Sequence, residues 1–228
     1  MKFGTGRVLY AYIPLCLLLT CGVAAGQAGP VFSGQEWQSY GQDPGGMRFS
    51  PLKQINQTNV QQLQRAWTYE LPRNPSTDIV AFESTPLMAD DILYFATPTG
   101  QAIALDAETG KQLWLFDPFS GDKGNRRPVV NRGVAYWEGR SLIACGGEDG
   151  SVDRRIFYVT PDARLFALNP ATGNPCPGFG KEGAIDLREG VASAWPELEY
   201  GDTSPPVKRT ERRGQGFRRA DGKAGVEV

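Results

Sequence analysis

Short apolar runs follow one another along the chain, and turn sequences separate them. The runs are rich in Val, Ile, Tyr, Phe and Trp, which favour a pleated and partly buried surface. The separating sequences include Glu108-Thr109-Gly110 and Ala171-Thr172-Gly173, which supply or tolerate a positive φ. No alternation of strands with long helices occurs, so the pattern predicts an all-β fold with one short helix over residues 59–67. We expect strands over residues 66–71, 92–97, 102–106, 112–116, 133–137, 142–145, 156–160 and 165–169.

An internal repeat at an offset of 63 residues refines this fold class. Residues 93–98 align with residues 156–161, and the Thr-Gly pair at 109–110 aligns with that at 172–173. Repeated strand hairpins are typical of a β-propeller or a β-solenoid. Because a propeller blade takes about 40–50 residues, we expect an insertion in the first repeat, over residues 117–131.

The turn of the first repeat carries its own packing prediction. Ala104 is small, Gly110 closes the hairpin, and Trp114 follows on the next strand. We therefore expect the Trp114 ring to pack against the neighbouring blade and to bury a large apolar area. Pro177 stands at the corresponding place of the second repeat, so that edge must be sealed in another way.

The N-terminus has the layout of a secretory signal peptide. Lys2 and Arg7 precede an apolar run over residues 8–19, and small residues follow it. The run is shorter than the roughly 20 residues of a membrane span, so we expect a cleaved signal over residues 1–28 and export to the periplasm. An uncleaved anchor, or a lipoprotein attached through Cys21, is the alternative. No other long apolar stretch predicts a transmembrane helix in the mature chain.

Composition narrows the chemistry further. The chain of 228 residues has 24 basic and 25 acidic side chains, a net charge of −1, which argues against a nucleic-acid partner. It contains no His, which removes Ser-His and Cys-His nucleophile pairs and most zinc sites. Outside the signal only Cys145 and Cys176 remain, and the sequence leaves open whether they are bridged or are two free buried thiols.

Three stretches of the chain have a family likeness: the spaced residues Glu36-Trp37, Gly41, Phe49-Ser50, Ile55-Asn56, Asn59-Val60, Leu63 and Trp67; the turn motif at 104–114; and the segment at 131–137. Through them the chain resembles the pyrroloquinoline quinone (PQQ)-dependent dehydrogenases, or quinoproteins, whose tryptophan-docking motif and cofactor-pocket segment the second and third stretches match. The resemblance covers residues 35–207. It implies a partial β-propeller, about three blades of an eight-bladed quinoprotein propeller.

The resemblance also implies a cofactor site. PQQ is a flat ortho-quinone with three carboxylates, so a guanidinium that grips a carboxylate or quinone oxygen suits it. Arg132 matches the family's position for that role, Glu83 matches a pocket glutamate, and Thr160 matches a pocket threonine. Thr160 shares its repeat position with Thr97, so a purely structural role for Thr160 stays open. Tyr136 and Trp137 are interpreted as core aromatics.

The implied reaction is oxidation of a hydroxyl group, with hydride transfer to the quinone, Ca²⁺ as Lewis acid and an aspartate as base. Electrons then leave for ubiquinone or a cytochrome. Residues 174–180 and 183–187 are similar to the glucose and quinate dehydrogenase branch, which implies a sugar or polyol substrate. The adjacent cysteines of the methanol-oxidising members are absent, since residues 127–130 read Arg-Pro-Val-Val.

The resemblance stops at Val207. Residues 208–228 are rich in basic side chains and have no strand period, which predicts a disordered or frame-shifted tail or a natural basic terminus. We expect the base and the Ca²⁺ ligands beyond Val207, so the isolated chain is predicted to be inactive. The alternative function is a non-catalytic propeller module like the outer-membrane assembly lipoproteins, which share the docking repeat.

Overall fold

The computed structural model describes residues 36–43, 45–72, 81–121, 130–140, 145, 152–191, 194–195, 197–198 and 200–207. The predicted signal at 1–28 and the tail at 208–228 lie outside these residues, and so does most of the predicted strand at 142–145. In the described part of the chain, no helix is long and apolar enough to cross a membrane.

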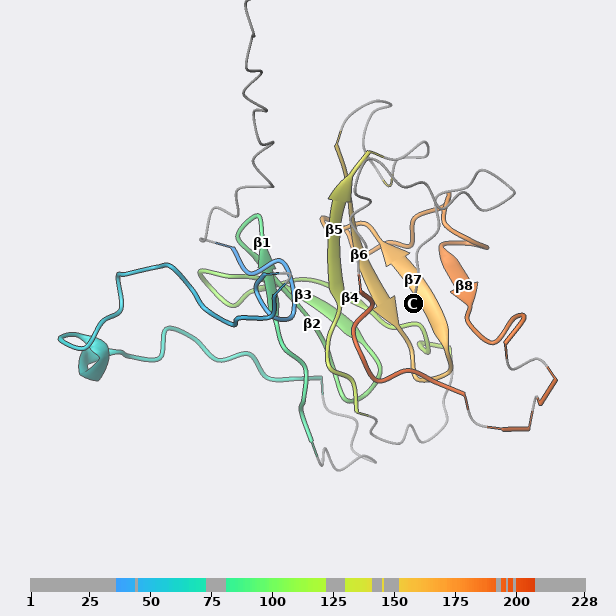
Figure 1. The fold of residues 1–228 in the computed structure, drawn as a ribbon, viewed down its shortest axis with the longest axis horizontal. Coiled ribbons are helices and arrows are strands. Elements are labelled where there is room, and N and C mark those ends of the chain that lie inside the picture. Colours follow the sequence, from blue (N-terminus) through green and yellow to red (C-terminus); the bar gives the residue numbers. More distant parts are fainter. Residues whose placement is uncertain are drawn as a thin grey trace, which may run out of the picture. The chain divides into compact units, whose positions relative to one another are not determined.

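The described residues form two four-stranded antiparallel sheets, in which each strand pairs with the next along the chain (Figure 1). This meander is the arrangement of a propeller blade, and the predicted all-β propeller class is confirmed. The first sheet contains β1 (Leu87–Ala89), β2 (Ile92–Ala96), β3 (Ala102–Asp106) and β4 (Gln112–Phe116). The second contains β5 (Ala135–Gly139), β6 (Asp153–Val159), β7 (Arg164–Leu168) and β8 (Ala184–Asp186).

The repeat seen in the sequence is a structural repeat. In the first sheet Leu93 of β2 pairs with Leu105 of β3. At an offset of 63, Ile156 of β6 pairs with Leu168 of β7 in the same antiparallel register. The two sheets therefore present equivalent residues on equivalent faces.

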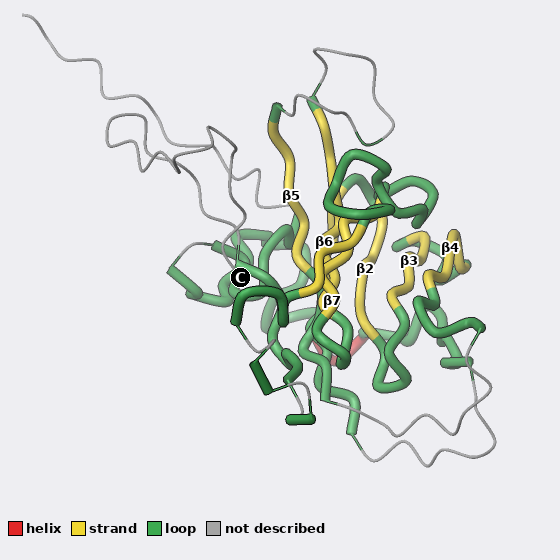
Figure 2. Tube along the Cα trace, turned by 90° about the vertical axis from the view of Figure 1, so that its right-hand side faces the viewer, coloured by secondary structure: helices red, strands yellow, loops and turns green. Residues whose placement is uncertain are grey.

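One core fills the space between the two sheets. Figure 2 shows β2 of the first sheet beside β6 and β7 of the second. Each sheet contributes buried aromatic and aliphatic residues to this core, which from the first sheet include Tyr94, Ala104 and Trp114, and from the second Tyr136, Ile156, Tyr158, Phe166 and Leu168. Burial of apolar surface stabilises a protein by about 25 cal/mol per Å², so this core makes the main contribution to the packing of the two sheets.

Trp114 makes the predicted contact with the neighbouring sheet. Its indole Nε1 donates a hydrogen bond to the carbonyl oxygen of Pro170 at 2.7 Å. Its ring lies over Gly173, where an added β-carbon would come within 2.7 Å of the ring. The tryptophan of one blade thus packs on the Thr-Gly turn of the following blade.

The edge at Pro177 is sealed by a disulfide and an aromatic pair. Cys145 and Cys176 are bonded to each other, with their Cα atoms 4.9 Å apart, which resolves the alternative that the sequence left open. Phe179 packs edge-to-face on Phe157, with ring centroids 5.5 Å apart. These residues form the apolar cluster on the far face of the second sheet, where the first repeat would place a tryptophan.

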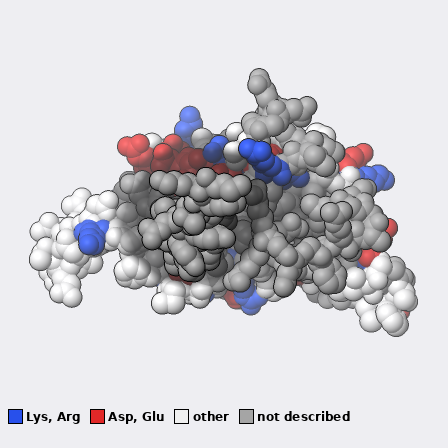
Figure 3. All heavy atoms as spheres, turned by 45° about the horizontal axis from the view of Figure 1, so that its top comes forward, with Lys and Arg blue, Asp and Glu red and all other residues white. Residues whose placement is uncertain are grey.

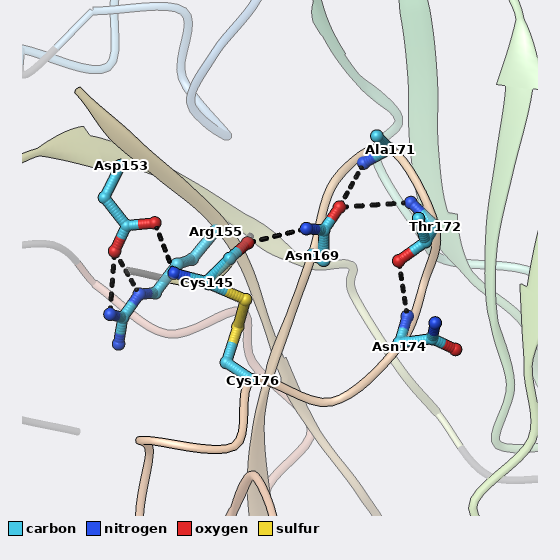
Figure 4. Close-up of a disulfide and its surroundings, with 8 residues drawn as sticks. All are labelled: Cys145, Asp153, Arg155, Asn169, Ala171, Thr172, Asn174 and Cys176. Atoms are coloured by element: carbon cyan, nitrogen blue, oxygen red, sulfur yellow. Dashed lines mark hydrogen bonds and ion pairs between the residues drawn. A yellow bond between two sulfur atoms is a disulfide. The ribbon is translucent and has the colours of Figure 1, made fainter. Parts of the chain in front are cut away.

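Buried polar groups fix the disulfide in place (Figure 4). Asp153, only 2% exposed, accepts hydrogen bonds from the backbone N–H of Cys145 at 2.9 Å and from Arg155 Nε at 2.8 Å. Asn169 donates to the Cys145 carbonyl oxygen at 2.6 Å and accepts from the N–H groups of Ala171 and Thr172. Asp153 and Asn169 thus hold both backbone polar groups of Cys145, its N–H and its carbonyl oxygen.

Three local predictions differ from the structure. The helix expected over residues 59–67 is a single 3₁₀ turn, Val60–Gln62, none of whose residues is buried, so tertiary packing does not extend the helix. Residues 66–71 alternate between exposed and partly buried positions, yet they pair with no strand among the described residues. The three-residue strands β1 and β8 were not predicted, because they are too short to show a period.

Candidate functional site

Three segments lie side by side where the first strands of the sheets begin. The segment before β1 donates from the N–H of Thr85 to the carbonyl oxygen of Arg132, at 3.1 Å. The segment before β5 donates in turn from the N–H of Arg132 to the carbonyl oxygen of Thr203, at 2.9 Å. Arg132 is therefore held by its backbone between residues that are far apart in the sequence.

The Arg132 side chain meets both neighbours as well. Its Nη2 lies 3.4 Å from Oε2 of Glu83, and its Nη1 donates to Oγ1 of Thr203 at 2.7 Å. The side chains of Arg132 and Glu83 are each 42% exposed. An exposed ion pair of this kind contributes only about 0–1 kcal/mol to stability. The guanidinium is thus oriented while remaining open to a further anionic partner.

The turn that carries Arg132 is rigid. Gly133 has a φ of +134°, and a β-carbon there would lie 3.1 Å from the carbonyl oxygen of Thr85, so this close approach requires glycine. The buried side chain of Asn131 accepts from the N–H of Gly133 at 3.0 Å and donates to the carbonyl oxygen of Val159 at 3.2 Å. These contacts fix the direction in which Arg132 points.

Thr160 follows Val159 directly, and Asn131 therefore ties its turn to that of Arg132. The Thr160 side chain is fully buried, and its Oγ1 accepts from the N–H of Arg164 at 3.0 Å and bonds to Asp162. Thr97 makes the equivalent bond to the N–H of Gln101 in the first repeat. The structure thus brings Glu83 and Arg132 into contact, and it places Thr160 nearby with its hydroxyl engaged in its own turn.

Thr203 is a site residue that the sequence analysis did not single out. A signal for it was present, because residues 202–205 read Asp-Thr-Ser-Pro and residues 83–86 read Glu-Ser-Thr-Pro. The same acid–hydroxyl–hydroxyl–proline pattern stands at both edges of the Arg132 turn. Comparing the two would have singled out Thr203, but not its contact with Arg132.

Charges of both signs lie on the surface of the described residues. On the face drawn in Figure 3, basic and acidic side chains of the described residues lie close to one another. Within the described ranges no group of three or more His, Cys, Asp or Glu residues could hold a metal ion. The site residues therefore offer a ligand one oriented guanidinium, hydroxyl groups and a carboxylate.

The two meander sheets pack through a docked tryptophan, and an arginine precedes β5, the first strand of the second sheet. This arrangement defines a segment of a β-propeller with a candidate anion-binding site. Comparison with known families agrees. The family described as "PQQ: Glucose/ethanol/alcohol dehydrogenase, beta-propeller domain" matches residues 37–212. The chain belongs to this β-propeller family of PQQ-dependent dehydrogenases.

Individual relatives span several substrates. The chain is 36% identical over 178 residues to a quinoprotein glucose dehydrogenase of Escherichia coli, which covers 76% of the chain and 22% of the relative. It is 32% identical over 188 residues to a quinate/shikimate dehydrogenase (quinone) of Acinetobacter baylyi, covering 75% and 22%. A quinohemoprotein alcohol dehydrogenase structure from Pseudomonas putida superposes with a TM-score of 0.55 at 29% identity, covering 77% and 22%. The chain thus spans less than a quarter of the length of these relatives.

Proposed function

We propose that this chain forms part of the PQQ pocket of an exported dehydrogenase that oxidises a hydroxyl group of a sugar or polyol. The observation that carries the proposal is the Arg132 guanidinium, which Glu83 and Thr203 orient at the beginning of the inner strands. A second support is the family to which the chain belongs.

The residues present fit the cofactor chemically. PQQ carries carboxylates and quinone oxygens, and a guanidinium can donate to such oxygens in bidentate fashion. The Thr203 hydroxyl adds a donor or acceptor at 2.7 Å from the same guanidinium. Glu83 holds the guanidinium in orientation, and Thr160 is assigned to the edge of the same pocket. When bound, PQQ supplies the electron acceptor for alcohol oxidation and Ca²⁺ supplies a Lewis acid.

The names of several relatives support the substrate class. Proteins named glucose dehydrogenase, glycerol dehydrogenase and quinate/shikimate dehydrogenase match at 32–36% identity, and all of these names denote polyhydroxylated substrates. A 1-butanol dehydrogenase (cytochrome c) of Thauera butanivorans matches at 30%. We assign a sugar or polyol as substrate, a quinone or cytochrome as electron acceptor, and the periplasm as location on the strength of the signal-like residues 1–28.

A titration of the purified full chain with PQQ, followed by tryptophan fluorescence, tests the cofactor assignment. We expect Arg132→Gln to weaken binding about tenfold or more, since a charge-assisted bidentate contact is lost. Arg188→Gln is the matched control, because Arg188 is also exposed and also lies 3.4 Å from a carboxylate, that of Asp186. Equal binding by the two variants, or no binding by the unmodified chain while the Escherichia coli relative binds, would refute the proposal.

A further inference from the structure

The turn between β6 and β7, residues 160–163, is in contact with the segment that carries Thr203. A β-carbon at Gly201 would lie only 2.4 Å from the carbonyl oxygen of Pro161, about 1 Å short of ordinary van der Waals contact. Gly201 does not have the left-handed φ that favours glycine, so its backbone conformation alone would accept a side chain. The close approach of two backbone segments is therefore what excludes a side chain at position 201.

Hydrogen bonds hold this turn in place. The buried hydroxyl oxygen of Thr160 accepts from the N–H of Arg164 at 3.0 Å, and the N–H of Thr160 donates to the Arg164 carbonyl oxygen at 2.9 Å. Ala163 is fully buried and has a φ of +64°, a conformation that a residue other than glycine keeps only where its surroundings hold it. Its carbonyl oxygen accepts from the N–H of Leu187 at 2.8 Å. A side chain at Gly201 would therefore displace its own segment rather than the turn.

The Gly201 segment holds Arg132 through two groups of Thr203. The carbonyl oxygen of Thr203 accepts from the N–H of Arg132 at 2.9 Å, and its Oγ1 accepts from Nη1 of Arg132 at 2.7 Å. A displacement of about 1 Å would lengthen these contacts beyond hydrogen-bond distance, which ends at about 3.2 Å. The guanidinium would then be left with its ion pair to Glu83, an exposed contact that orients it weakly.

Arg132 does not follow this displacement, because its own turn is fixed to the same part of the second sheet. The buried side chain of Asn131 donates to the carbonyl oxygen of Val159 at 3.2 Å and accepts from the N–H of Gly133 at 3.0 Å. Val159 is the last residue of β6 and directly precedes the β6–β7 turn. The distance between Arg132 and Thr203 therefore depends on how each of their segments contacts this turn.

We propose that Gly201 is a positioning residue of the site, which places Thr203 at hydrogen-bond distance from Arg132 and so orients the guanidinium for an anionic ligand. Thr160 contributes indirectly, because its hydrogen bonds build the turn on which Gly201 lies. That the ligand is PQQ rests on the proposed function, whereas the contact between Gly201 and the turn does not. A side chain at position 201 should thus loosen Arg132 even when no ligand is present.

Hydrogen exchange, measured by NMR on the full chain without ligand, tests the positioning. In Gly201→Ala the N–H of Arg132 should exchange about tenfold or more faster, because its acceptor on Thr203 has moved away. The N–H of Thr85, whose acceptor is the carbonyl oxygen of Arg132, should change by less than about twofold. Gly121→Ala is the matched control, since Gly121 also lacks a left-handed φ and has no atom of the described residues within 4 Å of an added β-carbon.

Titration with PQQ relates this geometry to binding. Gly201→Ala should weaken binding about three- to tenfold, since the loosened guanidinium must be ordered again when the ligand binds. Thr203→Val should cause a similar loss. Adding Gly201→Ala to Thr203→Val should weaken binding by less than about twofold more, because both changes release the same guanidinium. Gly121→Ala should bind PQQ as the unmodified chain does.

The outcomes separate the inference from the proposed function. Faster exchange at both amides, unchanged exchange at Arg132, or losses that multiply in the double variant would each overturn the inference, and so would unchanged PQQ binding by Gly201→Ala. If the unmodified chain binds no PQQ, the proposed function fails, and exchange at Arg132 alone decides whether Gly201 positions it. If Gly201→Ala does not fold, insertion of one glycine after Gly201 replaces it, because the insertion moves Thr203 out of register without a clash.

Discussion

Gly173→Ala tests whether the tryptophan contact holds the two sheets together. Gly173 has a φ of +72°, and its added β-carbon would lie 2.7 Å from the Trp114 ring. The left-handed conformation costs an alanine about 1–2 kcal/mol. Overlap with a ring that is 7% exposed, and that is held by its bond to Pro170, adds about 1–3 kcal/mol. We expect the free energy of unfolding to fall by about 2–5 kcal/mol.

The matched control is Gly190→Ala. Gly190 has a φ of +76° and nothing within 4 Å of the added carbon, so its substitution carries only the backbone cost. Urea unfolding, followed by tryptophan fluorescence and far-UV circular dichroism, gives both values. In a Trp114→Ala background the loss caused by Gly173→Ala should shrink to that of the control. Equal losses for the two glycine variants in the unmodified background would refute the reasoning.

The remaining predictions concern pH, a polar swap and the disulfide. Burial, followed by nearby carboxylates, raises the pKa of Tyr136 above its ordinary value of 10.0, so the stabilising effect of the neutral phenol is complete below pH 10 and is lost as the pH rises further. Tyr136→Phe should therefore flatten the fall of the unfolding free energy at alkaline pH, and an unchanged slope would contradict this. Asn169→Asp removes the amide donor to the Cys145 carbonyl oxygen and should lower the unfolding free energy by about 1–3 kcal/mol. Asp106→Asn should lower it by less, because the Asp106 side chain serves its turn only as an acceptor. A larger loss for Asp106→Asn in urea unfolding would count against this reasoning. Reduction of the Cys145–Cys176 bond, which links residues 31 apart, should lower the unfolding free energy by about 2–4 kcal/mol. A variant with both cysteines changed to serine is the control, because reductant should not affect it. An unchanged urea midpoint of the unmodified chain in reductant would contradict a stabilising role.

The strands that the sequence predicted best are those long enough to show an apolar run between two turn sequences. Gln112–Phe116 and Ala102–Asp106, each of five residues, were predicted with their observed bounds. Residues 66–71 were predicted as a strand, and they alternate between exposed and partly buried positions. They pair with no strand among the described residues, because a local pattern does not specify a partner.

The sequence likewise predicted some residues of the site and missed others. Motif position singled out Arg132 and Glu83, and the structure brings them within 3.4 Å. Thr203 lies 71 residues from Arg132 and was missed, because its relation to Arg132 depends on how successive blades stack. Cys145 and Cys176 stayed ambiguous for the same reason, since no local pattern specifies that two loops meet.

The site and the packing of the blades are physically coupled. Arg132 is held by Thr85, which precedes β1, and by Thr203, which lies 71 residues further along the chain. A change that shifts one sheet against the other therefore moves the two ends of this hydrogen-bonded chain. Gly173→Ala acts on the packing at the opposite end of β7, away from Arg132. If it weakens PQQ binding while Gly190→Ala does not, the pocket is shaped by the stacking of blades rather than by the Arg132 turn alone.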